Sequence, residues 1–256
     1  MDASEHEVVA PPAWRRIDFI SDLHLGDDTP STFAAWSDYL LNTRADAVFI
    51  LGDLFEAWVG DDARFEGFEA TAAALLREAA RRLPVAFMVG NRDFLLGAEM
   101  LAACGVQALH DPTVLCAFDQ RAILSHGDAW CLADTDYQRF RTEVRDPAWR
   151  ARILAKPLAE RRALARNIRS ESERKAAEHQ GAWADVDAPT AIEALLLAHA
   201  TTLVHGHTHR PATEALAPTL ARHVLSDWDL DHADRAQVLR WRDGVWTRLT
   251  PADAVA

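Results

Sequence analysis

The sequence is poor in cysteine and lacks any long apolar run. Its 256 residues include only three cysteines, Cys104, Cys116 and Cys131, and no two of them form a Cys-x-x-Cys pair. An odd, scattered set of thiols argues against a disulfide framework and a zinc ribbon, so we expect free, buried thiols in a reducing compartment. A transmembrane helix needs about 18 consecutive apolar residues, and no run in the sequence reaches that length.

The N-terminus and the charge balance argue against further classes of protein, namely those with a signal peptide and those that bind nucleic acid. Residues 1–12 contain neither a basic nor an apolar stretch, so we expect no signal peptide and predict a flexible tail over residues 1–13. A formal net charge of −12 argues against nucleic-acid binding. The charge is uneven, because Arg145 to Lys175 contains ten basic and four acidic residues. Such a segment either contacts something anionic or forms a solvated helix face.

Alternating strand and helix patterns predict a single α/β domain. In the first half of the chain, short apolar runs alternate with helical segments, which is typical of parallel strands with helices on their faces. We predict strands over 16–21, 46–51, 85–89, 113–118, 121–125, 202–204, 223–226, 236–241 and 245–249, and helices over 31–42, 65–83, 97–104 and 189–200. From Asp134 to about Ala184 the sequence is polar with helical propensity. We therefore predict one domain over residues 14–256, with a helical insertion over about 134–184.

Five polar clusters follow predicted strands, and each contains side chains that bind metals. The candidate ligands are Asp22, His24, Asp53, Asn91, His126, His205 and His207. Because sites in open α/β sheets lie at the carboxyl ends of strands, we expect these side chains to meet. Imidazole, carboxylate and amide donors without thiolate suit Mn, Fe or Zn, and a set of this size suits two ions sharing a carboxylate. Asp53 follows a strand predicted to be buried on both faces and is the candidate shared ligand.

The spacing within the clusters supports convergence. In an extended segment, side chains two residues apart point the same way, so Asp-x-His and His-x-His can each place two donors on one centre. We expect Gly206 to permit a close approach and an unusual backbone angle. His209 is expected to lie beside the ligands. Any one of these histidines could instead be structural, but their joint occurrence at strand ends favours a metal site.

In this order, the motifs Asp-x-His, Gly-Asp, Gly-Asn, His-Gly-Asp and His-Gly-His-Thr-His resemble the calcineurin-like metallophosphoesterase superfamily, over residues 22–209. The resemblance implies a four-layer αββα sandwich with a helical cap insertion and a dinuclear centre. It implies that Asp22, His24 and His207 hold one ion. Asn91, His126 and His205 would hold the other, and Asp53 would bridge them. The two ions would activate the water that attacks phosphorus in line.

Arg92 sets this chain apart within that superfamily. Many members have histidine after Gly-Asn, whereas this chain has Arg92. Arginine cannot act as a general acid at neutral pH, but its guanidinium suits phosphate oxygens and developing charge. We therefore predict that Arg92 is catalytic, together with Asp53. The alternative is a structural ion pair between Arg92 and a nearby acid such as Asp93.

Longer stretches resemble one group of pyrophosphatases over nearly the whole chain. They are Gly-Asn-Arg-Asp-Phe-Leu-Leu-Gly (90–97), the segment 52–62, His-Gly-Asp-x-x-Cys (126–131) and His-Gly-His-Thr-His-Arg-Pro (205–211). The resemblance implies hydrolysis of UDP-2,3-diacylglucosamine in lipid A synthesis, by water attack on the α-phosphorus. The products would be UMP and 2,3-diacylglucosamine 1-phosphate. It also implies two Mn²⁺ ions and a peripheral location at the cytoplasmic face of the inner membrane, and we expect no protein partner.

The same resemblance implies substrate contacts from the core and the insertion. The core residues would be Asn91, Arg92 and His205, and the cap residues Asp134, Ser170, Arg174 and Lys175. The group has asparagine four residues after the serine and lysine three further on, so Arg174 and Lys175 depart from its pattern. The basic, amphipathic insertion suits an anionic membrane surface, unless it is only a helix packed on the sandwich.

Two other functions stay open on the sequence. One is a dinuclear metallophosphoesterase that acts on a nucleotide or a phosphodiester. The other is a non-catalytic scaffold, which the presence of every ligand argues against.

Overall fold

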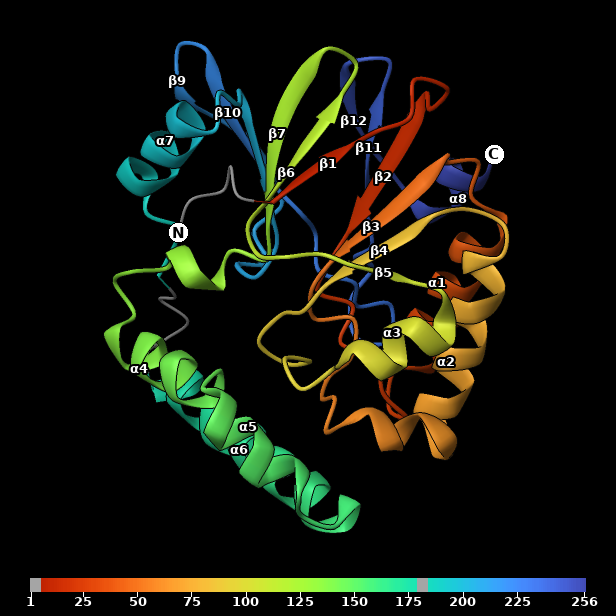
Figure 1. Cartoon of the computed structure of the whole chain (residues 1–256), viewed down its shortest axis with the longest axis vertical. Helices are drawn as coiled ribbons and strands as arrows, with labels where there is room; N and C mark the ends of the chain where they lie inside the picture. Colours follow the sequence, from red (N-terminus) through yellow and green to blue (C-terminus); the bar gives the residue numbers. More distant parts are fainter. Residues whose placement is uncertain (1–5, 179–183) are drawn as a thin grey trace.

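Two six-stranded sheets lie face to face at the centre of the molecule (Figure 1). The computed structural model describes residues 6–178 and 184–256, except for the side chains of residues 171–173 and 175–178. The first sheet contains, in spatial order, β1 (Glu7–Val9), β6 (Thr113–Ala117), β7 (Gln120–Ser125), β8 (Thr202–His205), β10 (Leu220–Val224) and β9 (Ala212–Ala217). The second contains β12 (Val245–Leu249), β11 (Val238–Arg242), β2 (Arg16–Ile20), β3 (Ala47–Leu51), β4 (Val85–Met88) and β5 (Gln107–Ala108). Strands β2 to β5 are parallel, as predicted.

Helices cover the outer face of each sheet, so the domain has four layers (Figure 1). The helices over the second sheet are α1 (Pro30–Asn42), α2 (Gly67–Ala80), α3 (Ala98–Cys104) and α8 (Pro251–Val255). Helix α7 (Ala188–Leu197) packs on the first sheet. Two short 3-10 helices, η2 (Asp61–Phe65) and η3 (Asp128–Trp130), lie in loops. The predicted αββα sandwich is confirmed.

Strand β3 shows how the sequence builds these layers. All five of its residues are buried, as expected for a strand with a covered surface on both sides. Its side chains alternate, so Phe49 packs in the core between the sheets, whereas Val48 and Ile50 pack beneath the helices. This central position delivers Asp53 to the middle of the sandwich.

Most predicted elements are present, and the exceptions have local causes. The hairpin of β6 and β7 and that of β11 and β12 are antiparallel, as predicted. The flexible tail predicted over residues 1–13 is wrong in part, because β1 pairs in parallel with β6. A three-residue edge strand carries too few side chains to show an alternating pattern. Strands β5 and β9 and helix α8 were missed for similar reasons of length or exposure.

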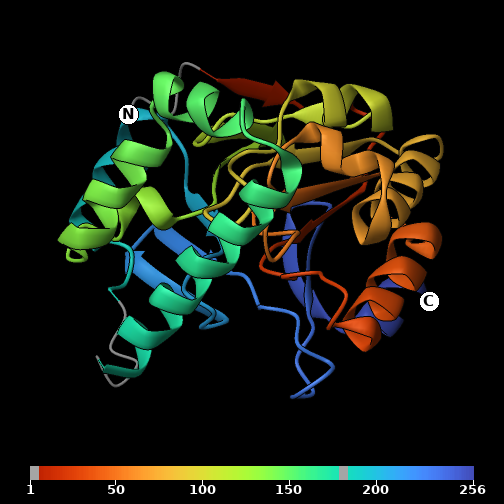
Figure 2. The ribbon, with the colours of Figure 1, turned by 90° about the horizontal axis from the view of Figure 1, so that it is seen from below.

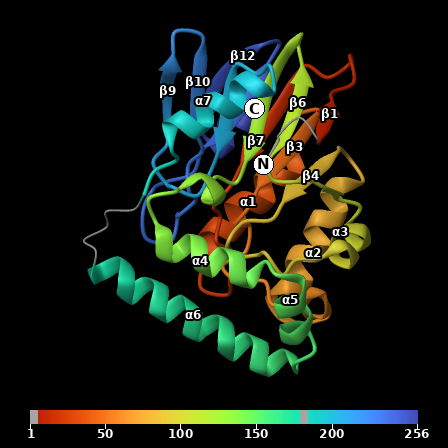
Figure 3. The ribbon, with the colours of Figure 1, turned by 60° about the vertical axis from the view of Figure 1, so that its left-hand side comes forward.

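Three helices occupy the predicted insertion. They are α4 (Thr135–Val144), α5 (Pro147–Leu154) and α6 (Leu158–Glu178), and we call them the cap. The cap lies below the sheets in Figures 1 and 3, and Figure 2 shows α6 crossing beneath them. In residues 6–178 and 184–256, no helix combines the length and the apolar composition that crossing a bilayer requires. The free thiols of Cys104 and Cys131 are buried, as predicted, and that of Cys116 is partly exposed.

A buried ion pair ties the second sheet to two helices. Asp18 on β2 is fully buried and accepts hydrogen bonds from Arg240 on β11, at 2.7 and 2.9 Å. Its carboxylate also accepts from the hydroxyls of Tyr39 and Thr43, each at 3.0 Å. Arg240 donates in addition to the carbonyl of Ala254 in α8, at 2.9 Å. The carboxylate is therefore compensated on all sides, and the network depends on each partner.

We predict that Asp18→Asn lowers the free energy of unfolding by roughly 3–5 kcal/mol, because it leaves the Arg240 charge buried without its partner. Chemical denaturation would measure the loss. The control is Asp243→Asn, which removes an ion pair with Arg15 between side chains that are 51% and 69% exposed. It should cost less than about 1 kcal/mol. Equal costs for the two variants would contradict the role given to the Asp18 network.

Candidate metal centre and substrate pocket

The structure brings the seven predicted ligands to adjoining strand ends. Backbone hydrogen bonds join the loops that follow the strands: Asp22 donates to the carbonyl of Gly52 at 3.1 Å, and Gly206 donates to that of His126 at 3.0 Å. Strands β7 and β8 run parallel and in register up to His205, so His126 and His205 leave the first sheet side by side. Both sheets therefore deliver donors to one place.

The backbone at these strand ends is not extended, which corrects the sequence-based argument. Asp22 has a φ of 57°, His24 of 48°, Asp53 of 52° and His207 of 68°. Each lies in the left-handed region, which costs a non-glycine residue on the order of 1 kcal/mol or more. The side chains converge because left-handed turns re-aim them, and not because of strand alternation. Such strain gathers at functional sites, where the surrounding fold holds it in place.

Two buried carboxylates form the middle of the cluster. Asp22, Asp53 and His126 offer ligand atoms that lie within 4.8 Å of one another. Asp53 Oδ1 accepts a hydrogen bond from the backbone N–H of Arg92 at 2.8 Å, and its Oδ2 lies 3.6 Å from His126 Nε2. Burial opposes ionisation of Asp22, but the imidazoles around it, His209 above all, hold its pKa well below the usual range. Buried carboxylates this close together favour a bound cation.

Backbone carbonyls fix the tautomers of two buried histidines. Nδ1 of His126 lies 2.9 Å from the carbonyl of Leu51, and Nδ1 of His205 lies 2.9 Å from that of Gly206. Because a carbonyl only accepts, each Nδ1 carries hydrogen and each Nε2 is the atom available for a metal. Burial lowers the pKa of His205 to about 4, so this ring is neutral. Burial also opposes protonation of His126, but Asp53 and Asp22 raise its pKa to about 9.

Asn91 links the remaining donors. Its Oδ1 lies 2.9 Å from Nε2 of His126 and 2.8 Å from Nδ1 of His207. Burial lowers the pKa of His207 to about 4, which leaves a neutral imidazole there. His209, which we expected beside the ligands, has its Nε2 3.2 Å from that of His24 and 3.3 Å from Oδ1 of Asp22. It therefore contacts two predicted ligands.

This donor set fits a dinuclear centre. Nε2 of His205 is buried and has no hydrogen-bond partner among the described residues, although a buried imidazole nitrogen normally has one. The neighbouring donors are carboxylate, amide and imidazole groups, which suit first-row divalent ions. Asp22, His24 and His209 form a second group whose ligand atoms lie within 4.8 Å of one another. Asp22 belongs to both groups, so these side chains could hold two ions.

Glycines make this crowding possible. A Cβ on Gly90 would collide with the carboxylate and backbone nitrogen of Asp53, and one on Gly206 would collide with Asp22. A Cβ on Gly52 would lie 2.5 Å from Nδ1 of His126. The predicted close approach at Gly206 is therefore confirmed, but its φ is not positive, so the predicted unusual backbone angle is wrong.

Two acidic residues at the site were not assigned a role from the sequence. Asp93 is buried and accepts hydrogen bonds from the N–H groups of Gly90 and Leu54, at 2.7 and 2.8 Å. Burial and the nearby Asp53 raise its pKa to about 7. The alternative for Arg92, an ion pair with a nearby acid, is present, but the acid is Glu56, at 3.2 Å from the guanidinium, rather than Asp93. The two acids, Asp93 and Glu56, lie within motifs quoted in the sequence analysis. What each of them contacts depends on how the loops fold, which the motifs do not show.

Asp128 joins the cap to the site. Its Oδ2 accepts hydrogen bonds from the hydroxyl of Tyr137 at 2.6 Å and from Nε of Arg141 at 2.8 Å, both in α4. Arg145 donates to the carbonyl of Gly90 at 3.0 Å. The last turn of α4 is thus fastened to the loops that carry His126 and Asn91.

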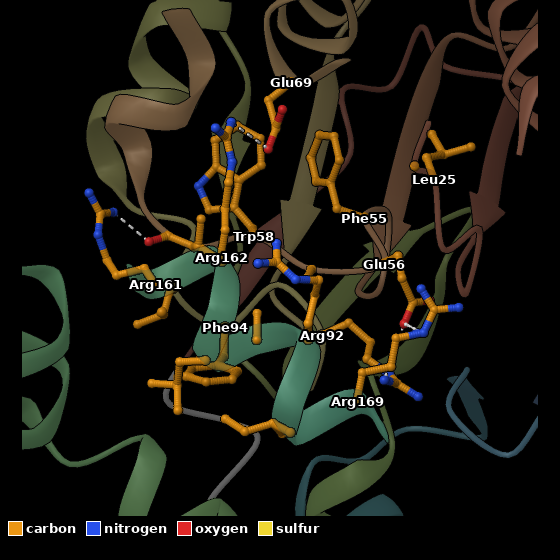
Figure 4. Close-up of a pocket in the computed structure, with 18 of the residues that line it drawn as sticks. Leu25, Phe55, Glu56, Trp58, Glu69, Arg92, Phe94, Arg161, Arg162 and Arg169 are labelled. Carbon is orange, nitrogen blue, oxygen red and sulfur yellow. Dashed lines mark hydrogen bonds and ion pairs between the residues drawn. The ribbon is translucent and has the colours of Figure 1, made fainter. Parts of the chain in front are cut away.

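A cavity of about 340 Å³ lies between the cap and the core, beside Arg92 (Figure 4). Its walls are largely apolar, with Phe55, Trp58 and Phe94 from the core and Leu164 and Ile168 from α6. The volume is in the range of pockets that bind small molecules or part of a larger ligand. The cavity joins an apolar compartment to the predicted catalytic arginine.

Much of the basic charge of the cap faces acidic residues of the core. Arg161 is only 4% exposed and forms a bidentate ion pair with Asp62. Arg162 pairs with Glu66 at 2.7 Å and with Glu69 at 3.3 Å. The sequence left open whether this basic segment contacts something anionic or forms a solvated helix face. The acidic residues of the core are such an anionic partner, within the same chain.

The predicted cap contacts to substrate differ in their surroundings. Asp134 caps α4, since its Oδ1 accepts from the N–H of Tyr137 at 2.9 Å. Ser170 and Arg174 lie exposed on α6. The side chain of Lys175 lies outside the described residues. Their roles toward substrate stay predictions.

Comparison with known proteins defines the class of this enzyme. Residues 15–211 match the family model of the calcineurin-like phosphoesterases. The chain therefore belongs to the calcineurin-like phosphoesterase family, a family that implies a dinuclear metal centre. The predicted superfamily and the predicted hydrolase class are confirmed.

Several similar proteins share one name. The UDP-2,3-diacylglucosamine hydrolase of Chromobacterium violaceum is 47% identical over 238 residues, which cover 89% of this chain and 95% of that protein. The protein of that name from Bordetella pertussis is 44% identical and covers 87% of this chain and 88% of its own length. The one from Xanthomonas campestris is 43% identical, with coverages of 82% and 90%.

We predict that Gly90→Ala removes metal binding, because the added methyl would displace the carboxylate of Asp53. Elemental analysis after incubation with Mn²⁺ should give the low metal content of Asp53→Ala. The control is Gly105→Ala, whose φ of 70° makes it strained but whose Cβ would have only Ala80 nearby, at 3.7 Å. It should lose roughly 1 kcal/mol of stability and keep its metal. Full metal content in Gly90→Ala would contradict the packing argument.

Proposed function

We propose that this enzyme hydrolyses the pyrophosphate bond of UDP-2,3-diacylglucosamine, with two Mn²⁺ ions as cofactors. Water attacks the α-phosphorus, and the bond between that phosphorus and the bridging oxygen breaks. The bridging oxygen leaves with the β-phosphorus, so the products are UMP and 2,3-diacylglucosamine 1-phosphate. The relatives named above support this substrate, and the reaction belongs to lipid A synthesis.

The single observation that carries the proposal is the apolar cavity beside Arg92. A nucleotide or simple phosphodiester has no long apolar group to bury against Phe55, Leu164 and Ile168, which line the pocket. A substrate that carries two acyl chains next to a diphosphate needs an apolar compartment adjoining a phosphate site. The position of the cavity between the cap and the strand ends meets that requirement.

In the proposed centre, Asp22, His24 and His207 would hold one ion, Asn91, His126 and His205 would hold the other, and both would use Asp53. Bound ions would supply a lowered pKa for the attacking water and a counter-charge for the phosphoryl oxygens. Hydrogen bonds from Nδ1 of His126 and His205 to backbone carbonyls keep each Nε2 turned toward the centre.

Arg92 acts on the phosphate. Its guanidinium binds the oxygens of the diphosphate and stabilises the charge that develops as the bridging bond breaks. The leaving group is a phosphate monoester, whose second pKa is about 6, so it departs without a proton. A histidine acid at this position is then unnecessary, which accounts for arginine after Gly90-Asn91. Asn91, His205, Asp134, Ser170, Arg174 and Lys175 complete the proposed substrate contacts.

The enzyme works, in this proposal, as a peripheral protein at the cytoplasmic face of the inner membrane. An acylated substrate resides in a bilayer, so the cavity must face one. Arg161 and Arg162 are engaged by core carboxylates, and they are poor candidates for lipid contact. Arg152 and Lys156, near the junction of α5 and α6, are exposed and can reach anionic headgroups.

We expect UDP-2,3-diacylglucosamine to be cleaved with a kcat/KM at least about 100-fold above that of the non-acylated UDP-sugar. Each CH₂ buried in the cavity is worth about 0.8 kcal/mol, so a few suffice. Release of UMP in the same detergent would measure both rates. Leu164→Glu, in the cavity wall, should reduce the preference, whereas Leu196→Glu, at a side chain that is 61% exposed on α7, should not. Equal rates on both substrates would favour the alternative, a phosphoesterase acting on a nucleotide or phosphodiester.

We also expect Arg152→Gln with Lys156→Gln to weaken binding to vesicles that contain anionic lipid by roughly thirtyfold, since each basic residue near such a surface contributes about 1 kcal/mol. Co-sedimentation at fixed salt would measure the change. The control double variant, Arg15→Gln with Arg242→Gln, removes the same charge from two exposed side chains far from the cap. Equal weakening by both would indicate a general charge effect rather than a membrane-facing cap.

A further inference from the structure

Glu56 stands where the metal centre, the phosphate site and the cap meet. It lies three residues after Asp53, and its side chain is 16% exposed at the mouth of the cavity. Figure 4 shows its carboxylate between Arg92 from the core and Arg169 from α6. Neither the motifs nor the proposed mechanism gives this residue a task.

One oxygen of Glu56 faces the metal centre. Its Oε2 lies 3.3 Å from Nδ1 of His24, an electrostatic contact, since this buried nitrogen has no partner with hydrogen-bond geometry among the described residues. A carboxylate at that position favours hydrogen on Nδ1, which leaves Nε2 of His24 as the atom directed to the cluster of Asp22 and His209. Carboxylates that orient a ligating histidine in this way usually determine metal affinity by a factor of 10 or more, on the order of 10–100.

The other oxygen is shared by two arginines. Oε1 lies 3.2 Å from the guanidinium of Arg92 and 3.3 Å from Nε of Arg169. It is buried and makes no contact with hydrogen-bond geometry among the described residues, so attraction of charge holds the group together. Arg161 is the opposite case. Its guanidinium is fixed by both oxygens of Asp62 and by the carbonyls of Val59 and Lys156.

This contrast separates a locked arginine from one that is paired through a single oxygen. Arg161 would lose a bidentate pair by turning to a ligand, whereas Arg92 would give up one oxygen of Glu56. Arg169 shares that oxygen and also lies 4.0 Å from Asp28. Without a counter-charge, two guanidinium groups this close would repel and splay apart. Glu56 can therefore gather them at the cavity mouth and release them to phosphate oxygens.

We propose that Glu56 is a positioning residue that directs His24 to the metal centre and holds Arg92 and Arg169 in place for the diphosphate. The part that concerns the arginines rests on the proposed function, whereas the part that concerns His24 does not. When the substrate enters, its phosphate oxygens replace Oε1 as the partner of the two arginines. Glu56 itself does not contact the reacting atoms.

The test is Glu56→Gln, which keeps the shape and removes the charge. Titration of the protein with Mn²⁺ alone, followed by electron paramagnetic resonance of the free ion, should show an affinity at least tenfold lower. With saturating Mn²⁺ and UDP-2,3-diacylglucosamine, kcat should fall roughly 10–100-fold. KM should rise as well, because Arg92 and Arg169 splay apart without the charge of Glu56. A merely disturbed pocket would raise KM but leave the Mn²⁺ affinity unchanged.

Two further variants keep the outcome decisive. Glu66→Gln removes another ion pair between cap and core, with Arg162, and should change neither the Mn²⁺ affinity nor kcat. Arg169→Gln removes only the cap-side partner and should leave Mn²⁺ affinity within twofold. The proposal is overturned if Glu56→Gln binds Mn²⁺ like the unaltered protein, or if Arg169→Gln or Glu66→Gln lowers the affinity equally. If the unaltered enzyme does not cleave UDP-2,3-diacylglucosamine, the proposed function fails while the Mn²⁺ titration still tests Glu56.

Discussion

The close approach of backbone loops around Asp22 and Asp53 is the constraint on which the site depends. Both carboxylates are buried, and glycines 90 and 206 lie where a side chain would overlap them. The left-handed backbone at four of the predicted ligands is a second consequence of the same crowding. Donors from two separate sheets reach one point only because the chain accepts this strain. The remainder of the sandwich, with its apolar layers on both sides of β3, supplies the stability that makes the strain affordable.

The layers and the ligand residues were predictable from the sequence, and the reasons are physical. A fully apolar strand such as β3 followed by Gly52-Asp53 leaves few alternatives, and the order of five such clusters is specific. The sequence could not predict how the donors converge, since φ values at Asp22 and His24 are properties of the closed loops. Nor could it predict the partner of Arg92, because Asp93 is adjacent in sequence while Glu56 is adjacent in space. Short edge elements such as β1 carry too few residues for a periodic pattern.

The basic charge of the cap attaches it to the acidic core, which its composition alone did not show. A chain with net charge −12 contains one basic segment, and that segment closes over acidic residues of the same molecule. The attraction is distributed, from Asp128 in η3, which pairs with Arg141 of α4, to Glu56 and Asp62, which pair with arginines of α6. The cap is therefore held by ion pairs around a cavity rather than by a continuous apolar interface. Such an attachment leaves the apolar side chains of α6 available for a ligand.

The contacts that fix Arg161 affect how the cavity recognises its ligand. Gly60 leaves room for the guanidinium, and Asp62 and two carbonyls hold it there. The wall formed by the start of α6 is thus set before any ligand arrives, and little conformational entropy remains to be lost on binding. A preformed wall also limits the length of the acyl chain that fits, because a longer chain would meet a side chain that cannot move aside. Discrimination among acyl chains would then depend on one ion pair that fixes the wall of the cavity.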